Sequence, residues 1–464
     1  MDIRERMKQG FLCYDGGMGT ALIRRGLQSG ERSERWNIDH PEEVTAVHLE
    51  FLRAGADIIL ANTFGANRFH YTREELEQVI RAGIRCAKEA VAQSGKEAWV
   101  ALDIGSTGHL LPPMGMLPFE EAVEIFGEIV RIGADAGADL IQIETMNDVY
   151  ELKAAVLAAR ENCGLPVFAT AVFDETAHML TGTSPESAVA LLEGLGCSAV
   201  GLNCGVGPEA AEKALRIMSE YASLPLIAKP NAGLPRVENG ETYFDVTPEA
   251  FAAQMRKIME IPGVQLVGGC CGTTAEHIRQ TCEAAGEQRM LPAADKPVAL
   301  ISSYQSCVNL GDSGLQISTA IDPAKDSELL EDLQDGAIDT VLDLADEALD
   351  DEADVLSIRL AAEGVDEAAC MKEAVMELQN INTMPFAIDS TDPAAVEAGI
   401  RIYNGKALVN AGEASGETLE RICRIAARYG AVVNSQRTDR EAVRTAARDS
   451  GLKEKDLVFG LYPA

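Results

Sequence analysis

The feature that most constrains this chain is an alternation of short apolar runs with amphipathic stretches, repeated eight times between Phe11 and Gly286. The apolar runs begin at Phe11, Asp57, Trp99, Asp139, Pro166, Ala199, Pro225 and Val264. The intervening stretches, such as Pro41–Ala56, have proline in the first turn, then acids, then apolar residues at helical spacing. Near-continuous apolar strands that alternate with helices indicate parallel strands buried on both faces. Eight such units in about 280 residues predict an α/β fold, a closed (β/α)8 TIM barrel rather than an open doubly wound sheet.

Polar and glycine-rich residues follow nearly every predicted strand of this barrel. They are Asp15-Gly16-Gly17, Asn62-Thr63, Asp103, Glu144, Asp174, Asn203-Cys204, Lys229-Pro230-Asn231 and Gly268-Gly269-Cys270-Cys271. The carboxyl ends of barrel strands meet at one rim, where such folds place their active sites. Turn glycines explain part of the pattern, but they do not explain acids, amides and cysteines at the same relative position in so many units. We therefore expect a functional site at this rim.

Beyond the barrel, the polar stretch Gln288–Val298 carries two prolines and no periodicity, which is typical of a domain boundary. We place the barrel domain at residues 1–290, a linker at 291–298 and a second domain at 299–464. In this second half we expect strands that begin at Val298, Asp354, Pro385, Lys406, Ala431 and Asp456. Six βα units are too few for a closed eight-stranded barrel, so we expect an incomplete (β/α) barrel-like domain.

One segment of the second half is strongly acidic. Between Asp326 and Asp354 there are 13 acids and no base. The acids are interleaved with leucines and valines at helical spacing, which favours a solvated helix face. A docking surface for a basic partner is the alternative interpretation.

The whole chain is acidic as well: its 464 residues include 73 acids and 40 bases, a formal charge of −33. This charge repels nucleic acid phosphates and anionic lipid headgroups, so we expect neither nucleic acid nor a membrane as a partner. No apolar run approaches the roughly 20 residues that a membrane helix needs. The first ten residues, MDIRERMKQG, have no apolar segment behind their charges, unlike a secretory signal. We therefore expect a cytoplasmic protein whose 11 cysteines are free thiols.

Three of these cysteines follow predicted barrel strands: Cys204 in GLNCGVG, and Cys270 and Cys271 in GGCCGTT. Three thiolates at neighbouring strand ends are a ligand set for tetrahedral zinc with one open position. Adjacent residues of a regular strand point to opposite faces, but the flanking glycines allow backbone angles that could turn the pair to one side. Such a centre suits a substrate thiol, whose sulfur would attack an electrophilic methyl group. We interpret the remaining cysteines as small core residues: Cys13, Cys86, Cys163, Cys197, Cys282, Cys307, Cys370 and Cys423.

The barrel half resembles the homocysteine S-methyltransferase family over residues 11 to about 286. The motifs that carry the resemblance are DGGMGT at Asp15, ANTFGAN at Ala61, IETMND at Ile143, GLNCG at Gly201 and GGCCGTT at Gly268. The resemblance implies that Cys204, Cys270 and Cys271 are the zinc ligands.

The same resemblance implies how the substrate is held. The family binds the amino group of homocysteine with acids that fall on Asp15 and Glu144, helped by polar residues at Thr63 and Asn203. Carboxylates at these positions make physical sense, because they offset the desolvation of an ammonium group that enters a partly buried rim.

The second half is similar to the pterin-binding (methyltetrahydrofolate) barrel of cobalamin-dependent methionine synthase. The best correspondence begins at Pro385 and continues with RYGAVV at Arg428 and DLVFGLYP at Asp456, and it places Asp389 and Asn410 in the pterin pocket. However, VNLGDSGLQ replaces an acidic-arginine-threonine-asparagine signature, DVLSIRL lacks an expected asparagine, and the last two units are absent. These departures argue against folate binding and favour a degenerate domain kept for docking or rigidity.

The resemblances imply methyl transfer to the thiol of homocysteine, which gives methionine. No cobalamin-binding DxHxxG motif occurs in the chain, so we expect methylcobalamin to arrive on a separate corrinoid protein or on a missing portion. S-methylmethionine or another sulfonium is the alternative donor. A non-catalytic zinc- or thiol-binding relative of methionine synthase is the alternative from another functional class.

Overall fold

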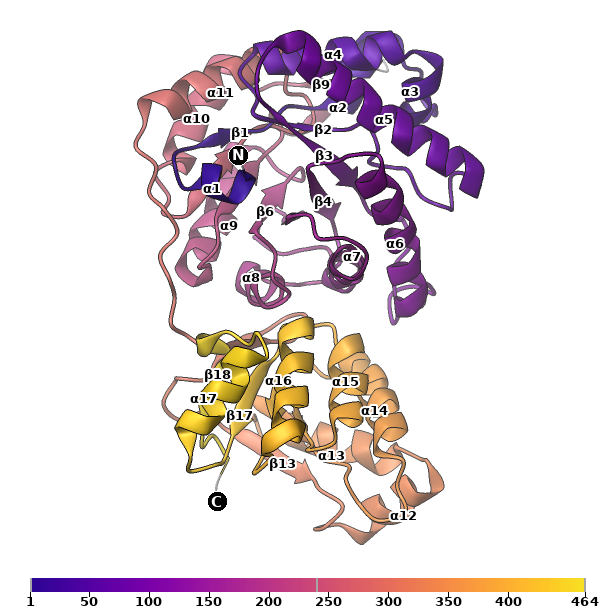
Figure 1. The fold of residues 1–464 in the computed structure, drawn as a ribbon, viewed down its shortest axis with the longest axis vertical. Helices are drawn as coiled ribbons and strands as arrows, with labels where there is room; N and C mark the ends of the chain where they lie inside the picture. The colour runs from indigo at the N-terminus through magenta and orange to yellow at the C-terminus, as the bar shows by residue number, and fades with distance from the viewer. Residues whose placement is uncertain (1, 239–240, 463–464) are drawn as a thin grey trace. The chain divides into compact units, whose positions relative to one another are not determined.

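The computed structural model describes residues 2–238 and 241–462, which form two compact units. The first unit comprises Met1–Thr181 and Cys197–Asp295, and the second comprises Gly182–Gly196 and Lys296–Ala464. Figure 1 shows strands surrounded by helices in the first unit and a sheet flanked by helices in the second. Both units are therefore α/β.

Eight parallel strands form the barrel of the first unit, in the order β1-β10-β7-β6-β5-β4-β3-β2. Their bounds are β1 (Leu12–Cys13), β2 (Ile58–Leu60), β3 (Trp99–Ile104), β4 (Leu140–Met146), β5 (Val167–Ala171), β6 (Ala199–Asn203), β7 (Leu226–Lys229) and β10 (Val264–Val267). A bridge between Tyr14 and Ile58 joins β1 to β2, and the Asp57 amide donates to the Cys13 carbonyl at 2.7 Å across the same seam. The ring is nearly closed, and the eight predicted strands are confirmed.

Helices alternate with these strands, as the sequence predicts. Those of the first unit are α1 (Ile3–Met7), α2 (Met18–Arg24), α3 (Trp36–Asp39), α4 (Pro41–Arg53), α5 (Arg73–Ser94), α6 (Phe119–Asp135), α7 (Val149–Asn162), α9 (Pro208–Tyr221), α10 (Pro248–Ile258) and α11 (Ala275–Glu287). Local signals fix several starts: Thr72 and Glu75 form a capping box at α5, and the Asp148 carboxylate accepts two backbone amides of α7. The helix between β5 and β6, α8 (Pro185–Gly194), is grouped with the second unit.

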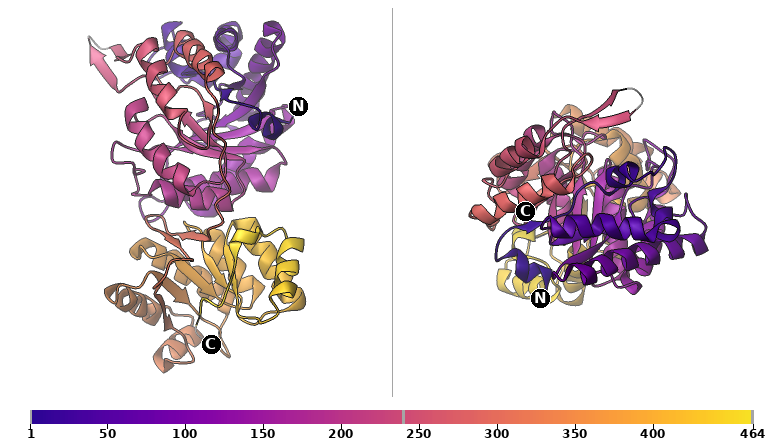
Figure 2. Two further views of the ribbon diagram at one scale, coloured as in Figure 1. Left: turned by 90° about the vertical axis from the view of Figure 1, so that its left-hand side faces the viewer. Right: turned by 90° about the horizontal axis from the view of Figure 1, so that it is seen from above.

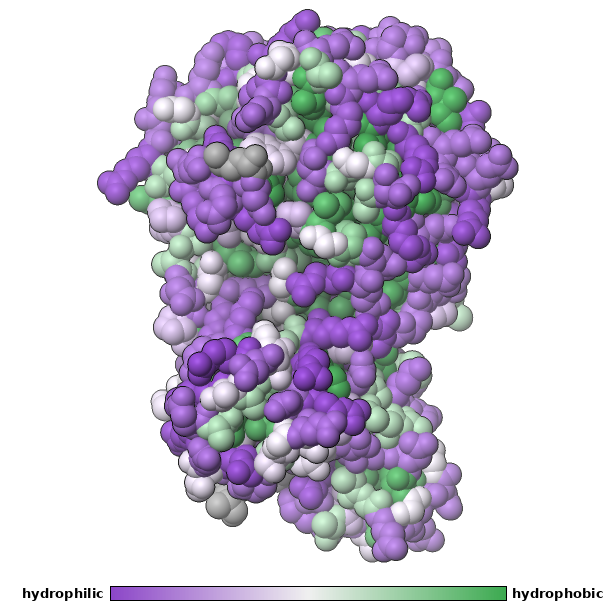
Figure 3. Space-filling model, viewed as in Figure 1, coloured by the Kyte–Doolittle hydropathy of each residue, from purple (hydrophilic) through white to green (hydrophobic). Residues whose placement is uncertain are grey.

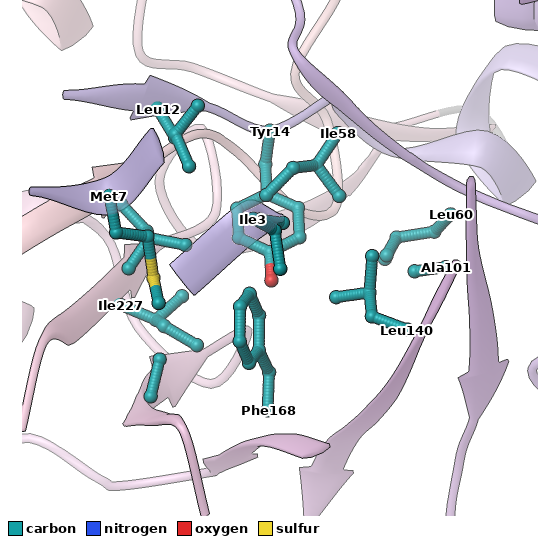
Figure 4. Packing of buried hydrophobic residues seen from close by; sticks show 12 residues of the cluster. Ile3, Met7, Leu12, Tyr14, Ile58, Leu60, Ala101, Leu140, Phe168 and Ile227 are labelled. Carbon is teal, nitrogen blue, oxygen red and sulfur yellow. The ribbon is translucent and has the colours of Figure 1, made fainter. Parts of the chain in front are cut away.

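The barrel interior is filled by alternate residues of the strands. The strand residues of this buried cluster are Leu12, Tyr14, Ile58, Leu60, Ala101, Leu140, Phe168, Ala199, Ile227 and Leu266 (Figure 4). Ile3 and Met7 of α1 pack into the same cluster, so the first helix completes the core. Because side chains alternate along a strand, the residues two or four positions beyond this layer share its inward orientation. The polar residues among them include Asp103, Gln142, Glu144, Thr170, Asn203 and Lys229.

An antiparallel hairpin between β7 and α10 was not predicted. It consists of β8 (Pro235–Glu238) and β9 (Glu241–Phe244), and Pro235 pairs with Phe244. Figure 2 shows the hairpin, in pink, projecting from the body of the first unit. The connection between β7 and α10 therefore carries a two-stranded sheet of its own.

The second unit contains a six-stranded parallel sheet in the order β13-β14-β15-β16-β17-β18. Its strands are β13 (Ile317–Ile321), β14 (Val355–Ile358), β15 (Phe386–Asp389), β16 (Leu408–Asn410), β17 (Val432–Ser435) and β18 (Leu457–Phe459). The helices that follow are α14 (Glu367–Ile381), α15 (Pro393–Ile402), α16 (Gly416–Tyr429) and α17 (Arg440–Asp449). The incomplete (β/α) barrel-like architecture is confirmed.

The membership of that sheet differs from the prediction at one strand. The apolar run at Val298 forms β11 (Leu300–Ser302), which pairs antiparallel with β12 (Cys307–Asn309) in a separate two-stranded sheet. The first strand of the parallel sheet is β13, which the sequence interpretation missed. Its sequence, ISTAI, has two adjacent polar residues and no long apolar run, and its residues are mostly half-buried, as expected for an edge strand.

The acidic segment forms α12 (Ser327–Asp335) and α13 (Asp339–Asp350). Both helices bury their apolar residues, among them Leu329, Leu333 and Val341, while most of their acids are exposed. This arrangement agrees with the predicted solvated helix faces.

No helix in the described part of the chain is both long and apolar enough to cross a membrane. Figure 3 shows a face of the molecule that is mostly hydrophilic, with apolar residues scattered among polar ones.

Candidate active site and metal centre

The sulfurs of Cys204, Cys270 and Cys271 lie together at the carboxyl ends of β6 and β10. Their sulfur atoms all lie within 4.8 Å of one another, and the Cys204 and Cys271 sulfurs are 3.9 Å apart. Zinc–sulfur bonds of about 2.3 Å separate two ligands of a tetrahedral site by roughly 3.8 Å. The cluster therefore fits a zinc ion, and it is the single group of three or more candidate metal ligands among the described residues.

An irregular backbone turns these side chains toward one another. Cys204 has φ of 59° and Gly272 has φ of 81°, both in the left-handed region. The segment after β7 then joins the two cysteine loops: the Cys270 amide donates to the Pro230 carbonyl, and the Ala232 amide donates to the Cys271 carbonyl, each at 3.0 Å. Of the three glycines beside the vicinal pair, Gly272 has the expected left-handed conformation, whereas Gly268 and Gly269 do not, and Cys204 contributes an unusual conformation of its own.

The three thiols strongly perturb one another. Hydrogen bonds from Cys270 and Cys271 lower the pKa of Cys204 to about 3, with a further contribution from Asn231. The contact with Cys204 raises the pKa of Cys271 to about 12 against an opposing effect of Cys270, and contacts with Cys204 and Cys271 raise the pKa of Cys270 well above its ordinary value. A cation that binds there displaces protons from the thiols whose pKa is raised.

A second group at the rim consists of buried charges. The Lys229 ammonium lies 2.6 Å from a carboxylate oxygen of Glu144, and both side chains are almost fully buried. Lys229 also sits 4.7 Å from the centre of the Tyr14 ring, which its positive charge favours. Burial lowers the pKa of Lys229, but the negative charges of Glu144, Asp15, Cys270 and Asp103 outweigh it and raise the pKa overall. Lys229 is therefore held as a cation.

Asp15 and Asp103 are buried beside this ion pair. Burial raises the pKa of Asp15 to about 7 against the opposing effect of Lys229 and a hydrogen bond from the Leu60 amide at 2.8 Å. Burial also raises the pKa of Asp103 well above its ordinary value, with Glu144 adding to the rise. Both carboxyl groups consequently bind a proton more readily than an exposed aspartate does.

Thr63 and Asn203, the two polar residues predicted to help bind the substrate amino group, form hydrogen bonds to neighbouring strands. The Thr63 hydroxyl donates to the Asp103 carbonyl at 2.8 Å and accepts from the Asp103 amide at 3.1 Å. The Asn203 side chain accepts from the Thr145 amide at 2.8 Å and donates to the Thr145 hydroxyl at 2.7 Å. Thr145 has φ of 59° and follows Glu144 directly, so Asn203 stabilises the strained turn that orients Glu144. Asn203 also lies 3.7 Å from the Cys270 sulfur.

The structure thus brings together the predicted barrel residues Asp15, Thr63, Glu144, Asn203, Cys204, Cys270 and Cys271. It adds Lys229, Asp103 and Asn231, to which the sequence interpretation gave no role. All three had been noted as polar residues at strand ends. The polar side chains of these residues at strand ends could have indicated a role in the site, but the sequence did not show which of them are buried.

Asp389 and Asn410 lie in the second unit, at the carboxyl ends of β15 and β16. The Asn410 amide donates to Asp389 at 3.0 Å, and the two residues line a cavity of about 440 Å³. Arg359 lies 3.9 Å from the other oxygen of Asp389. The two predicted residues are therefore neighbours at one rim, in an environment of polar side chains.

Comparison with known proteins relates this chain to a defined family. A model of the homocysteine S-methyltransferase family matches residues 12–285, more than half of the chain. The chain belongs to the homocysteine S-methyltransferase family. The matched residues include both the cysteine cluster and the buried charges.

Curated relatives extend the similarity beyond the barrel. The chain is 29% identical over 499 residues to methionine synthase of Mycobacterium tuberculosis and 27% identical over 503 residues to methionine synthase of Mycobacterium leprae. Each similarity covers 98% of this chain and 40% of the relative. The chain thus spans about two-fifths of the length of the curated proteins that it matches.

Solved structures show the same fold. Two crystal structures of the homocysteine methyltransferase MmuM from Escherichia coli, in its oxidized and metallated forms, each give a TM-score of 0.50 at 24% identity. They cover 58% and 60% of this chain and 94% and 96% of MmuM. These matches establish that the family barrel is present here.

Proposed function

We propose that this protein is a zinc-dependent enzyme that transfers a methyl group to the thiol of homocysteine and so forms methionine. The observation that carries the proposal is the meeting of three cysteine sulfurs within 4.8 Å at the barrel rim. Cys204, Cys270 and Cys271 would hold the ion. Bound zinc lowers the pKa of a coordinated thiol, which makes the substrate sulfur nucleophilic at neutral pH.

The remaining rim residues orient the substrate. Asp15 and Glu144 are the acids for the amino group of homocysteine, and their burial favours an ammonium that neutralises them. Asn203 orients Glu144 through Thr145, and Thr63 fixes the end of β2 against β3. The methyl group then passes directly to the substrate sulfur, and no covalent enzyme intermediate is needed.

Methylcobalamin carried by a corrinoid partner is the donor that we propose. The support is that similarity to two proteins named methionine synthase extends over 98% of the chain, the second unit included. S-methylmethionine or another sulfonium is the alternative donor, because the zinc-thiolate chemistry requires only an activated methyl group. We place the reaction in the cytoplasm, which 11 cysteines without a disulfide among them support.

X-ray absorption at the zinc edge tests the proposal. The zinc-loaded chain is measured without and with homocysteine, and we expect one additional sulfur neighbour when homocysteine is present. An unchanged zinc shell would instead favour a non-catalytic zinc- or thiol-binding protein.

The donor is tested separately. Zinc-loaded protein and homocysteine are incubated with methylcobalamin, with S-methylmethionine or with methyltetrahydrofolate, and methionine is measured. We expect methionine from methylcobalamin. If methionine forms only with S-methylmethionine, the sulfonium is the methyl donor and methylcobalamin is not.

A further inference from the structure

Two carboxylate oxygens at the barrel rim have no hydrogen-bond partner within the described residues. They are Oδ1 of Asp15 and Oδ1 of Asp103, and their residues are only 1% and 6% exposed. Native proteins rarely leave a buried acceptor unpaired, because its lost hydration is not replaced. A pair of such atoms at one rim points to a donor that comes from outside the polypeptide.

The strands bring Asp103 into the same charged group as the predicted amine-binding acids. Asp103 lies two residues beyond Ala101 of the inward-facing core layer, and Glu144 lies four residues beyond Leu140 of that layer. The charges of Glu144, Lys229 and Asp15 all act on Asp103. Asp103 therefore faces the barrel axis among the other rim charges.

The group has fewer cations than carboxyl groups. It contains the three carboxyl groups of Asp15, Asp103 and Glu144, and Lys229 is the cation among them. The Lys229 ammonium makes its hydrogen bond to Glu144, at 2.6 Å. A primary ammonium group would supply one further positive charge and three N–H donors, enough for Asp15, Asp103 and Glu144 together.

We propose that Asp103 is a third carboxylate for the ammonium group of homocysteine and makes the site specific for thiols that carry an amino group. This assignment rests on the function proposed above, and it concerns a residue that the family resemblance did not indicate. The competing explanation is that Asp103 is a structural residue satisfied by a buried water or by its own proton.

Calorimetry on the full zinc-loaded chain separates these explanations. The two ligands are homocysteine and 4-mercaptobutanoate, which has the same thiol and carboxylate but no amino group. The variants are Asp103→Asn and Asp103→Ser, so that the test does not depend on the folding of one substitution. The control is Asp174→Asn, which removes a carboxylate after β5 that is exposed and bonded to Thr176.

We expect both Asp103 variants to bind homocysteine about 10- to 100-fold more weakly, the loss typical of one charge-assisted hydrogen bond. Their affinity for 4-mercaptobutanoate and their zinc content should equal those of the parent and of Asp174→Asn. Unchanged affinity for homocysteine, or an equal loss for both ligands, would overturn the role of Asp103 while leaving the proposed function intact. Failure of the unmodified protein to bind either thiol would contradict the proposed function itself, and the assignment with it.

Discussion

The two parallel sheets of this molecule place polar residues at the same ends of their strands, but they pair those residues differently. At the barrel rim, buried oxygens of Asp15, Asp103 and Asn231 lack partners among the described residues. At the rim of the second sheet, Asn410 donates to Asp389 and accepts from Asn434 at 3.0 and 2.9 Å. A rim that leaves acceptors unpaired is prepared for a ligand, whereas a rim whose amides bond to one another is already stabilised by its own side chains.

Two buried lysines, one in each unit, differ in the same way. Lys229 and Glu144 form their pair at the carboxyl ends of strands, beside two further carboxylates. Lys406 and Asp456 form a pair of similar length, 2.5 Å, but they precede β16 and β18 and lie at the opposite ends of their strands. The first pair belongs to the candidate site, and the second belongs to the framework of its unit.

The largest effect should come from removing a metal ligand. We expect Cys271→Ala to lose zinc and methyl transfer together, because two sulfurs do not hold zinc as three do. Zinc content by atomic absorption and methionine formation are measured on the same preparation. Cys163→Ala is the control, since this half-buried cysteine lies at the end of α7 outside the cluster. Full activity in Cys271→Ala would refute the ligand assignment.

Substitution of Lys229 and Lys406 comes next. Lys229→Met and Lys406→Met each leave a buried acid without its cation, so the free energy of unfolding should fall by about 3–5 kcal/mol in each. Only Lys229→Met should also weaken homocysteine binding, because Glu144 then loses the partner that fixes it. Urea unfolding measures the first effect and calorimetry the second. If both variants bind homocysteine normally, Lys229 is a framework residue like Lys406.

Much of this comparison could be predicted from the sequence. Strand periodicity identified the eight barrel strands, and the strand-end rule located Cys204, Cys270 and Cys271 at one rim. The ion pair of Glu144 with Lys229 could not be predicted, because the two residues are 85 positions apart and only the closed ring brings them together. Periodicity showed Lys229 as a polar residue after an apolar run, which is equally typical of an exposed strand end.

The errors in the predicted fold have local causes. The run at Val298 is apolar enough for a buried strand, but apolarity does not show which sheet a strand joins, and β11 pairs with β12 instead. The hairpin of β8 and β9 had a usable signal, because Asn239-Gly240 between alternating residues favours a tight turn.

His48 is a case in which buried polar atoms lack hydrogen-bond partners away from the candidate site, so it shows whether such atoms always indicate a ligand. Both of its ring nitrogens lack partners within the described residues, yet the residue lies in α4 rather than at the rim and is 0% exposed. Burial lowers the pKa of His48 from 6.5 to about 3. Between these values the unfolded chain binds a proton that the folded protein excludes, so stability is complete above pH 6.5 and falls as the pH decreases toward 3.

From pH 6.5 to 5 this effect amounts to about 2 kcal/mol. Asp15 acts in the opposite direction, because its raised pKa stabilises the folded state on acidification, so the measured quantity is the difference between variants. We expect His48→Leu to lose the acid-dependent decrease, measured by urea unfolding at both pH values. Exposed His178, substituted in His178→Leu, is the control. Equal pH dependence in both variants would mean that His48 has a partner, and the rule drawn from unpaired atoms would weaken at the rim as well.

The smallest effect should come from the second rim. Asp389→Asn keeps the acceptor for Asn410 and removes a charge 3.9 Å from Arg359, which is 49% exposed, so stability should change by about 1 kcal/mol or less. We also expect no heat of binding when methyltetrahydrofolate is titrated into the unmodified protein. Homocysteine affinity in the variant should stay within about twofold of the parent, because Asp389 belongs to the second unit and the candidate homocysteine site belongs to the first. The opposite result is equally clear. Methyltetrahydrofolate could instead bind, with Asp389→Ala abolishing that binding. The side chains of this rim would then bond to one another only until a pterin replaces those bonds. In that case hydrogen bonds among rim side chains would not distinguish a structural rim from a binding site.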